Sequence, residues 1–125
     1  MESGAILDTQ ITASSQWNAN HAPFQGRLHF RAKAGSWSAR WNNLRQWLQV
    51  DLSSQYTKVT RVATQGRNAY SQWVTKYKLQ YSNDGKNFQY YREQGKTTDW
   101  VKLKYLLYQR VNYPAQSRRM LPRVG

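Results

Sequence analysis

The chain has no cysteine, few acidic residues and no long hydrophobic run. Without cysteine it can form neither a disulfide nor a thiolate metal site. Only 6 Asp and Glu and 2 His occur among 125 residues, so carboxylate-pair and histidine-based catalysis have few candidates. No stretch approaches the ~20 apolar residues of a membrane-spanning helix. These absences argue against most hydrolytic enzymes, zinc proteins and helical membrane proteins.

The few residues that could perform catalysis or bind metal are poorly placed for either. His21 and His29 have no neighbouring carboxylate in the sequence, and their spacing fits no zinc site. A calcium site built from loop carbonyls with Asp8 or Asp84 stays open, although the oxygen-rich spacing of known calcium loops is missing. We therefore predict a non-catalytic protein that needs no cofactor.

Basic and aromatic residues are abundant instead. The sequence has 19 Lys and Arg and a formal net charge of +13, together with 6 Trp, 9 Tyr and 3 Phe. So many large apolar rings favour a folded chain, and the length indicates one domain with a core of its own. The positive charge attracts anionic partners such as sulfated glycans, acidic lipid headgroups or nucleic acid.

The hydrophobic pattern is that of β-strands. Alternation with a period of two runs through residues 48–52 and 74–81, and residues 58–64 form a further, more buried candidate strand. Asn83-Asp84-Gly85 is a strong turn signal, and residues 88–91 follow as the partner strand of a hairpin. Within 74–81 we expect one aromatic face and one basic face. No convincing helical periodicity occurs, so we predict an all-β fold.

Residues 11–41 contain few alternating runs and read as long loops with aromatic residues of the exposed type. These aromatic residues are Trp17, Phe30, Trp37 and Trp41. By contrast, Trp47 and Trp73 adjoin alternating strands, so we expect both in the core.

Three loops combine side chains that suit recognition. Trp17 stands between polar residues, where its ring either covers the core or meets a lipid interface or sugar face. Residues 29–35 join an aromatic residue to two basic ones, either as a plain solvated loop or as a contact for sulfate, carboxylate or phosphate. Residues 68–72 pair a tyrosine with amides. The candidate binding residues are Trp17, Asn18, Asn20, Phe30, Arg31, Lys33, Asn68, Tyr70 and Gln72.

The C-terminal residues 96–125 are unusual. They contain seven Lys or Arg and one Asp. Residues 101–108 form a candidate strand, whereas the part beyond Pro114 shows no periodicity and reads as a mobile tail.

Several of these motifs resemble, in order and spacing, the discoidin domain, or coagulation factor five/eight type C domain, family. Residues 3–15 are similar to its opening segment, and residues 46–52, 63–67 and 73–85 to its central strands. The likeness implies an antiparallel jelly-roll β-sandwich, of the galactose-binding-domain type. It also implies three loops at one end that bind phospholipid, glycans or protein ligands. By position these loops are residues 16–20, 30–35 and 68–72.

The resemblance covers about residues 3 to 95, so we divide the chain into a discoidin-like sandwich, 1–95, and an atypical basic segment, 96–125. Family members usually carry terminal cysteines, which this chain lacks, so the missing cysteines do not indicate a reducing compartment. Because the closing strands look incomplete, we expect low stability in urea or thermal unfolding unless residues 101–108 supply a strand.

The resulting hypothesis is an extracellular or cell-surface adhesion module. It would bind cell-surface glycans or anionic phospholipid, or a protein receptor, through the three loops. The first residues do not form a secretory signal. Binding of nucleic acid or another polyanion through a basic aromatic surface is the alternative, although no nucleic-acid motif is present. A non-functional fragment of a larger protein is a third interpretation.

Overall fold

The computed structural model describes residues 4–53, 57–59, 62–74, 77–91, 102–103, 105–110 and 120–124. Its strands are β1 (Ile11–Ala13), β2 (Trp47–Asp51), β3 (Thr57–Lys58), β4 (Val62–Gly66), β5 (Tyr77–Ser82), β6 (Gln89–Tyr90), β7 (Lys102–Leu103), β8 (Tyr105–Arg110) and β9 (Met120–Val124). Short 3₁₀ helices occur at η1 (Asp8–Gln10), η2 (Ala19–His21) and η3 (Pro23–Gly26). The described ranges contain no α-helix, in agreement with the predicted all-β fold.

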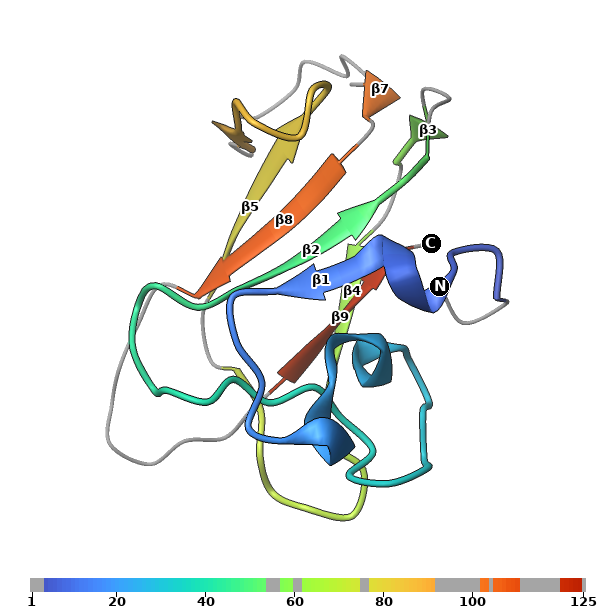
Figure 1. Cartoon of the computed structure of the whole chain (residues 1–125), viewed down its shortest axis with the longest axis vertical. Coiled ribbons are helices and arrows are strands. Elements are labelled where there is room, and N and C mark those ends of the chain that lie inside the picture. Colours follow the sequence, from blue (N-terminus) through green and yellow to red (C-terminus); the bar gives the residue numbers. More distant parts are fainter. Residues whose placement is uncertain are drawn as a thin grey trace.

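Five strands form the main sheet, in the order β1-β2-β8-β5-β6. Every neighbouring pair in it is antiparallel. Two further antiparallel pairs, β3–β7 and β4–β9, complete the strand pairing (Figure 1). The order is far from the sequence order, because β8 enters between β2 and β5.

The core lies on one face of the main sheet. Leu48 and Val50 of β2 are fully buried, and Ile11 and Leu52 complete the buried cluster. In the register of β1 and β2, Ile11 faces Val50. Val62 of β4 packs against this cluster, so the β4–β9 pair covers the core on the side opposite the main sheet. The predicted alternation in residues 48–52 is confirmed.

Strand β5 differs in part from the expectation. Tyr77, Leu79 and Tyr81 pack against the core, as the alternation predicted. On the other face, Lys78 is exposed, as expected for the basic face, whereas Gln80 is buried. Lys76, the other basic residue expected on this face, lies outside the described residues.

The β5–β6 hairpin is confirmed, with Gln80 opposite Tyr90. Its turn is organised by the carboxylate of Asp84, which accepts backbone hydrogen bonds from Lys86 and Asn87, each at 2.8 Å. Gly85 adopts φ 71°, a left-handed conformation that favours glycine.

The C-terminal part of the chain contributes strands where we expected gaps. β8 pairs with β2 on one side and β5 on the other, so this region supplies the strand that the sandwich needs. The prediction of a mobile tail is wrong for β9, which pairs with β4 along five residues. The expected strand at 101–108 appears as β7 and β8, while Val101 and Lys104 lie outside the described residues.

Some expectations for individual residues were wrong. β1 lies in a region that we read as loop, because three residues are too few to show a period. Trp37 is half-buried against the core, and its indole Nε1 donates to the Ser15 carbonyl at 2.9 Å. Trp47 and Trp73 are half-buried and do not belong to the core cluster. In β2, Trp47 alternates with Leu48 and so faces away from the core.

We predict that Leu48→Ala destabilises the fold by about 2–5 kcal/mol, because the deletion leaves a cavity in the packed core. The measurement is the free energy of unfolding in urea. Leu7→Ala is the matched control, since Leu7 is 63% exposed and its loss should change stability by less than about 0.5 kcal/mol. Equal effects of the two variants would contradict the assigned core.

The Asp84 turn gives a pH prediction. Hydrogen bonds from the Asn87 and Lys86 amides, and then from the Ser82 hydroxyl, lower the pKa of Asp84 well below its ordinary value of 3.8. A folded-state pKa below the unfolded one adds stability above that ordinary value and loses it as the pH falls. We therefore expect Asp84→Ala to lower the urea midpoint at pH 7 and to flatten its decline in acid. Asn83→Ala, at an exposed neighbour, should leave both unchanged.

Candidate functional site: the loop end

Three segments that are far apart in sequence meet at the lower end of the molecule in Figure 1. The backbone of Ala34 joins them. Its N–H donates to the Asn20 carbonyl of the first loop at 3.3 Å, and its carbonyl accepts from Arg67 Nε of the third loop at 2.8 Å. We call these three loops, residues 17–21, 30–35 and 67–72, together with residues 40–45, whose Arg40 amide donates to the Ser15 hydroxyl next to the first loop, the loop end.

The second and third loops also touch at Gly35. A Cβ at this position would lie 3.5 Å from Asn68 Cβ and 3.4 Å from the Phe30 carbonyl oxygen. Gly35 also has φ 65°, so a side chain would be strained there. Glycine thus permits the close approach of the two loops.

In the first loop, Trp17 is 57% exposed, so its ring does not cover the core. Its backbone N–H donates to the Ser38 carbonyl at 2.7 Å. Asn18 has a structural role, because its Oδ1 accepts from the Asn20 amide at 2.9 Å and bonds His21 Nδ1 at 2.8 Å. The loop therefore holds Trp17 outward on an internally bonded turn.

In the second loop, Phe30 is half-buried and packs edge-on against Phe24, with ring centroids 6.1 Å apart. This agrees with an anchoring role at the base of the loop. Lys33 is exposed, with its Nζ 5.8 Å from the Phe24 ring centroid. Arg31 is exposed and extends the basic surface.

In the third loop, Tyr70 is 60% exposed and Asn68 is also exposed, whereas Gln72 is half-buried. Gln72 Oε1 accepts from Arg67 Nη1 at 2.8 Å, so this amide supports the loop from inside. Of the nine candidate residues, Phe30 and Gln72 are half-buried, and the other seven are exposed: Trp17, Asn18, Asn20, Arg31, Lys33, Asn68 and Tyr70. Whether any of them binds a ligand stays a prediction.

The structure adds residues that the sequence analysis did not select. Trp41 is 55% exposed, Leu44 is exposed beside it in the chain, and the Arg40 guanidinium lies 5.2 Å from the Trp41 ring centroid. In the sequence, the available signal for Trp41 was the arginine next to it, but this did not distinguish Trp41 from Trp37. Only the tertiary contact of Trp37 with Ser15 separates them.

A polar cluster around the buried Gln46 ties residues 40–45, which we call the Trp41 loop, to the first loop. Gln46 Oε1 accepts from the Ser14 hydroxyl at 2.9 Å and from the Ser15 hydroxyl at 2.5 Å. Gln46 Nε2 donates to Asn43 Oδ1 at 2.9 Å. Because the Ser15 hydroxyl also accepts from the Arg40 amide, the cluster sets how Trp17 and Trp41 stand relative to each other.

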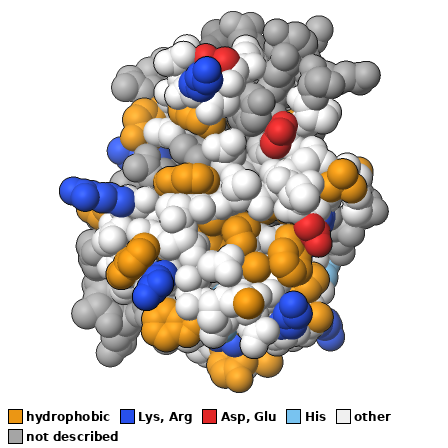
Figure 2. Space-filling view, in the orientation of Figure 1, with side chains coloured by type: hydrophobic (Ala, Val, Ile, Leu, Met, Phe, Trp, Pro, Cys, Tyr) orange, Lys and Arg blue, Asp and Glu red, His pale blue; other side chains and the backbone are white. Residues whose placement is uncertain are grey.

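The loop end is basic and free of acids. Residues 9–50 and 52–83 contain no Asp or Glu, so these loops carry five basic residues and no carboxylate: Arg31, Lys33, Arg40, Arg45 and Arg67. Figure 2 shows hydrophobic and basic side chains intermixed there, with the acidic side chains of this view higher on the molecule. Such a field attracts anions.

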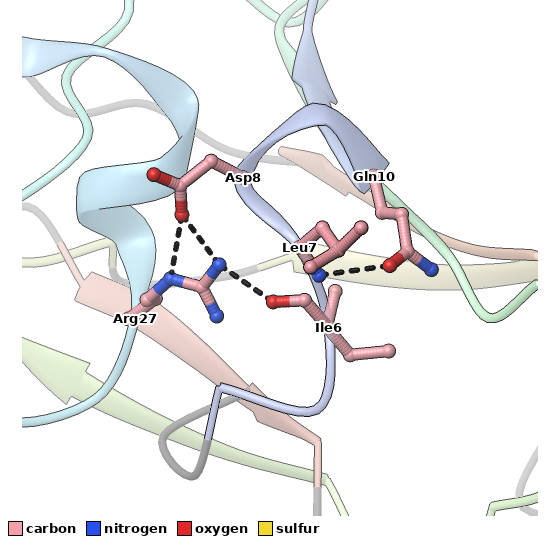
Figure 3. Close-up of polar contacts among 5 residues, drawn as sticks. All are labelled: Ile6, Leu7, Asp8, Gln10 and Arg27. Carbon is pink, nitrogen blue, oxygen red and sulfur yellow. Dashed lines mark hydrogen bonds and ion pairs between the residues drawn. The ribbon is translucent and has the colours of Figure 1, made fainter.

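Outside the loop end, Asp8 is already engaged (Figure 3). Its Oδ1 forms an ion pair with Arg27, whose Nη2 also donates to the Ile6 carbonyl at 2.6 Å. Asp84 binds the amides of its own turn. Across the described part of the chain, no three His, Cys, Asp or Glu residues form a cluster that could hold a metal ion. The same part contains no helix long and apolar enough to cross a membrane.

We predict that Gln46→Ala lowers the free energy of unfolding by about 1–3 kcal/mol, because Gln46 is buried and its loss removes the amide that accepts from the half-buried Ser14 and Ser15 hydroxyls and donates to Asn43. Urea unfolding followed by tryptophan fluorescence measures this. Gln16→Ala, at an exposed position in the first loop, is the control and should change stability by less than about 0.5 kcal/mol. An unaffected Gln46→Ala protein would mean that the cluster does not hold the loops.

Known proteins share this architecture. The F5/8 type C domain family matches residues 10–113. Coagulation factor V of Sus scrofa is 40% identical over 107 residues, which are 81% of this chain and 5% of that protein. The chain therefore spans a small part of that relative's length.

Two solved structures are similar in fold. Discoidin II from Dictyostelium discoideum superposes with a TM-score of 0.76 at 21% identity, covering 91% of this chain and 52% of that one. The family 32 CBM from C. perfringens NanJ, in complex with galactose, has a TM-score of 0.60 at 18% identity, covering 95% and 96%.

The family match passes Gly95, where our sequence resemblance ended, and includes β7 and β8. The likeness thus extends further than the motifs alone indicated, while a separate character for residues 96–125 stays a prediction. The jelly-roll fold is shared with the solved structures. This chain belongs to the F5/8 type C domain, or discoidin, family.

Proposed function

We propose that the chain is a non-catalytic recognition module that binds anionic phospholipid surfaces at the loop end, in an extracellular or cell-surface setting. One observation carries the proposal. Trp17, Trp41 and Tyr70 are each more than half exposed on loops that contain basic residues and no acid. Exposed aromatic rings with a polar edge suit the membrane interface.

Two forces would act together in this mode of binding. The rings of Trp17 and Trp41, with Leu44, would leave water for the headgroup region, at roughly 25 cal/mol per Å² of apolar surface. Arg31 and Arg45 are exposed and would approach the anionic headgroups, at about 1 kcal/mol for each basic residue near the surface. Neither force alone gives stable membrane binding, whereas their sum does.

Glycan binding is the second candidate function, supported by a different observation. Tyr70 presents an exposed ring beside the exposed amide of Asn68, and a ring with neighbouring amides suits a sugar face. A protein of similar fold has been solved with galactose. The loop end would then bind sugars mainly through the third loop.

Vesicle co-sedimentation separates these functions. We expect the chain to bind vesicles containing phosphatidylserine and to lose affinity with salt. Trp17→Ala should weaken binding roughly five- to thirtyfold, corresponding to about 1–2 kcal/mol of lost apolar contact. Tyr70→Ala should weaken it as well.

Tyr91→Ala is the matched control for Tyr70→Ala. Tyr91 is 55% exposed and lies outside the loop end, where it follows β6 and its backbone N–H donates to the Leu79 carbonyl of β5. Its loss should leave vesicle binding unchanged. Binding to immobilised galactose but not to vesicles would favour the glycan function, and equal losses in all three variants would refute the loop end as the site.

A further inference from the structure

A close contact between a cation and an aromatic ring lies inside the loop end. The Arg67 guanidinium carbon is 4.0 Å from the Tyr70 ring centroid, so the cation lies against one face of the ring. Tyr70 is nevertheless 60% exposed, which leaves much of the ring available to a ligand.

Arg67 is held in this place from several sides. Its Nε donates to the Ala34 carbonyl and its Nη1 to Gln72 Oε1, both at 2.8 Å. Its backbone N–H donates to the Gln72 carbonyl at 2.9 Å. The side chain is half-buried, and a planar guanidinium that is bonded along two edges has little freedom to swing away from the ring.

The acceptors of Arg67 are neutral, so its charge is not compensated. No carboxylate among the described residues pairs with it, and residues 52–83 contain no acid at all. Because its partners are neutral, the positive charge of this half-buried guanidinium acts through Tyr70 on a ligand that contacts the exposed part of the ring. The ring and the charge therefore act as one unit.

This arrangement has a consequence for ligand choice. Open aromatic faces attract quaternary ammonium groups such as choline. On Tyr70, a cation already lies against the ring, and its positive charge repels a second one. An anionic or uncharged group at the same ring meets no such penalty, and an anion is attracted.

We propose that Arg67 is a specificity-determining residue that acts through Tyr70, selecting anionic headgroups and disfavouring the choline of phosphatidylcholine. The inference rests on the proposed function of the loop end. It assigns that surface a means of telling headgroups apart, in addition to the apolar contact that makes it adhere.

The other ring–cation pairs lack this support. Arg40 lies 5.2 Å from the Trp41 ring centroid and is exposed, and it is its backbone amide that donates a hydrogen bond, to the Ser15 hydroxyl. Lys78 lies 5.0 Å from the Tyr90 ring centroid, away from the loop end in the β5–β6 hairpin. Arg67 alone among these three donates from its side chain to other loop residues.

The test compares Arg67→Met with the unaltered chain on three kinds of vesicle: pure phosphatidylcholine, and phosphatidylcholine mixed with either phosphatidylserine or phosphatidylglycerol. We expect Arg67→Met to lower the ratio of anionic to zwitterionic binding by roughly three- to tenfold, partly by raising binding to phosphatidylcholine. Comparing the two anionic lipids shows whether the chain responds to the charge of the headgroup or to its shape. Arg67→Lys keeps the charge but loses the planar stacking on Tyr70. Its ratio of anionic to zwitterionic binding should lie between those of the unaltered chain and of Arg67→Met.

Arg31→Met is the comparison for loss of charge alone. Arg31 is exposed in the second loop, so its loss should weaken binding to both anionic vesicles without raising binding to phosphatidylcholine. Thermal unfolding of each variant monitors the fold, and a gain of phosphatidylcholine binding is not a result that simple destabilisation produces.

The outcomes are distinguishable. If the unaltered chain binds no vesicle, the proposed function fails and the selectivity with it. If it prefers anionic vesicles and Arg67→Met keeps the same ratio, or shifts it no more than Arg31→Met, then the role of Arg67 alone is overturned. A selective gain toward phosphatidylcholine in Arg67→Met supports it.

Discussion

The structure depends most on the position of β2 between β1 and β8. Leu48 and Val50 on this strand are fully buried, and its backbone is hydrogen-bonded to neighbours on both sides. The register of β1 and β2 pairs Ala13 with Leu48, so Ser14 follows beside Trp47, and the Ser14 amide donates to the Trp47 carbonyl. The loops that carry Trp17 and Trp41 leave from this point, so the packing of one central strand determines where the candidate site stands.

The loop end adds a second set of constraints to this frame. Gln46 joins the first loop to the Trp41 loop, while the Ala34 peptide and Arg67 join the first, second and third loops. These bonds are internal, so the exposed rings are presented by a surface that is already organised before a ligand arrives. Preorganised surfaces lose less conformational entropy on binding. This is consistent with a recognition module whose contacts come from a few outward side chains.

Much of the fold could be predicted from the sequence because its strands carry strong local signals. Alternation marked β2 and β5, and Asn83-Asp84-Gly85 marked the hairpin. β1 and β9 gave no such signal: one is three residues long and the other contains Pro122, and both form only by pairing with distant strands. Pairings of this kind are set by the whole chain and leave little trace in a short window.

The candidate site was predictable in its location and less so in its details. Trp17 and Tyr70 were recognisable as rings among polar neighbours. Trp41 was not separable from Trp37, because the difference is a hydrogen bond to a carbonyl 22 residues away. The position of the Arg67 side chain was likewise hidden, since its partner Ala34 is 33 residues distant. Contacts between loops decide which of several similar side chains face solvent.

The central claim is that one end of the sandwich meets a membrane. Amide chemical shifts of the isotopically labelled chain, recorded with and without lipid nanodiscs containing phosphatidylserine, test it most directly. The account predicts changes confined to residues 17–20, 30–35, 40–45 and 67–72, with the β5–β6 hairpin unaffected. Changes centred on that hairpin, or spread evenly over the sheet, would contradict it.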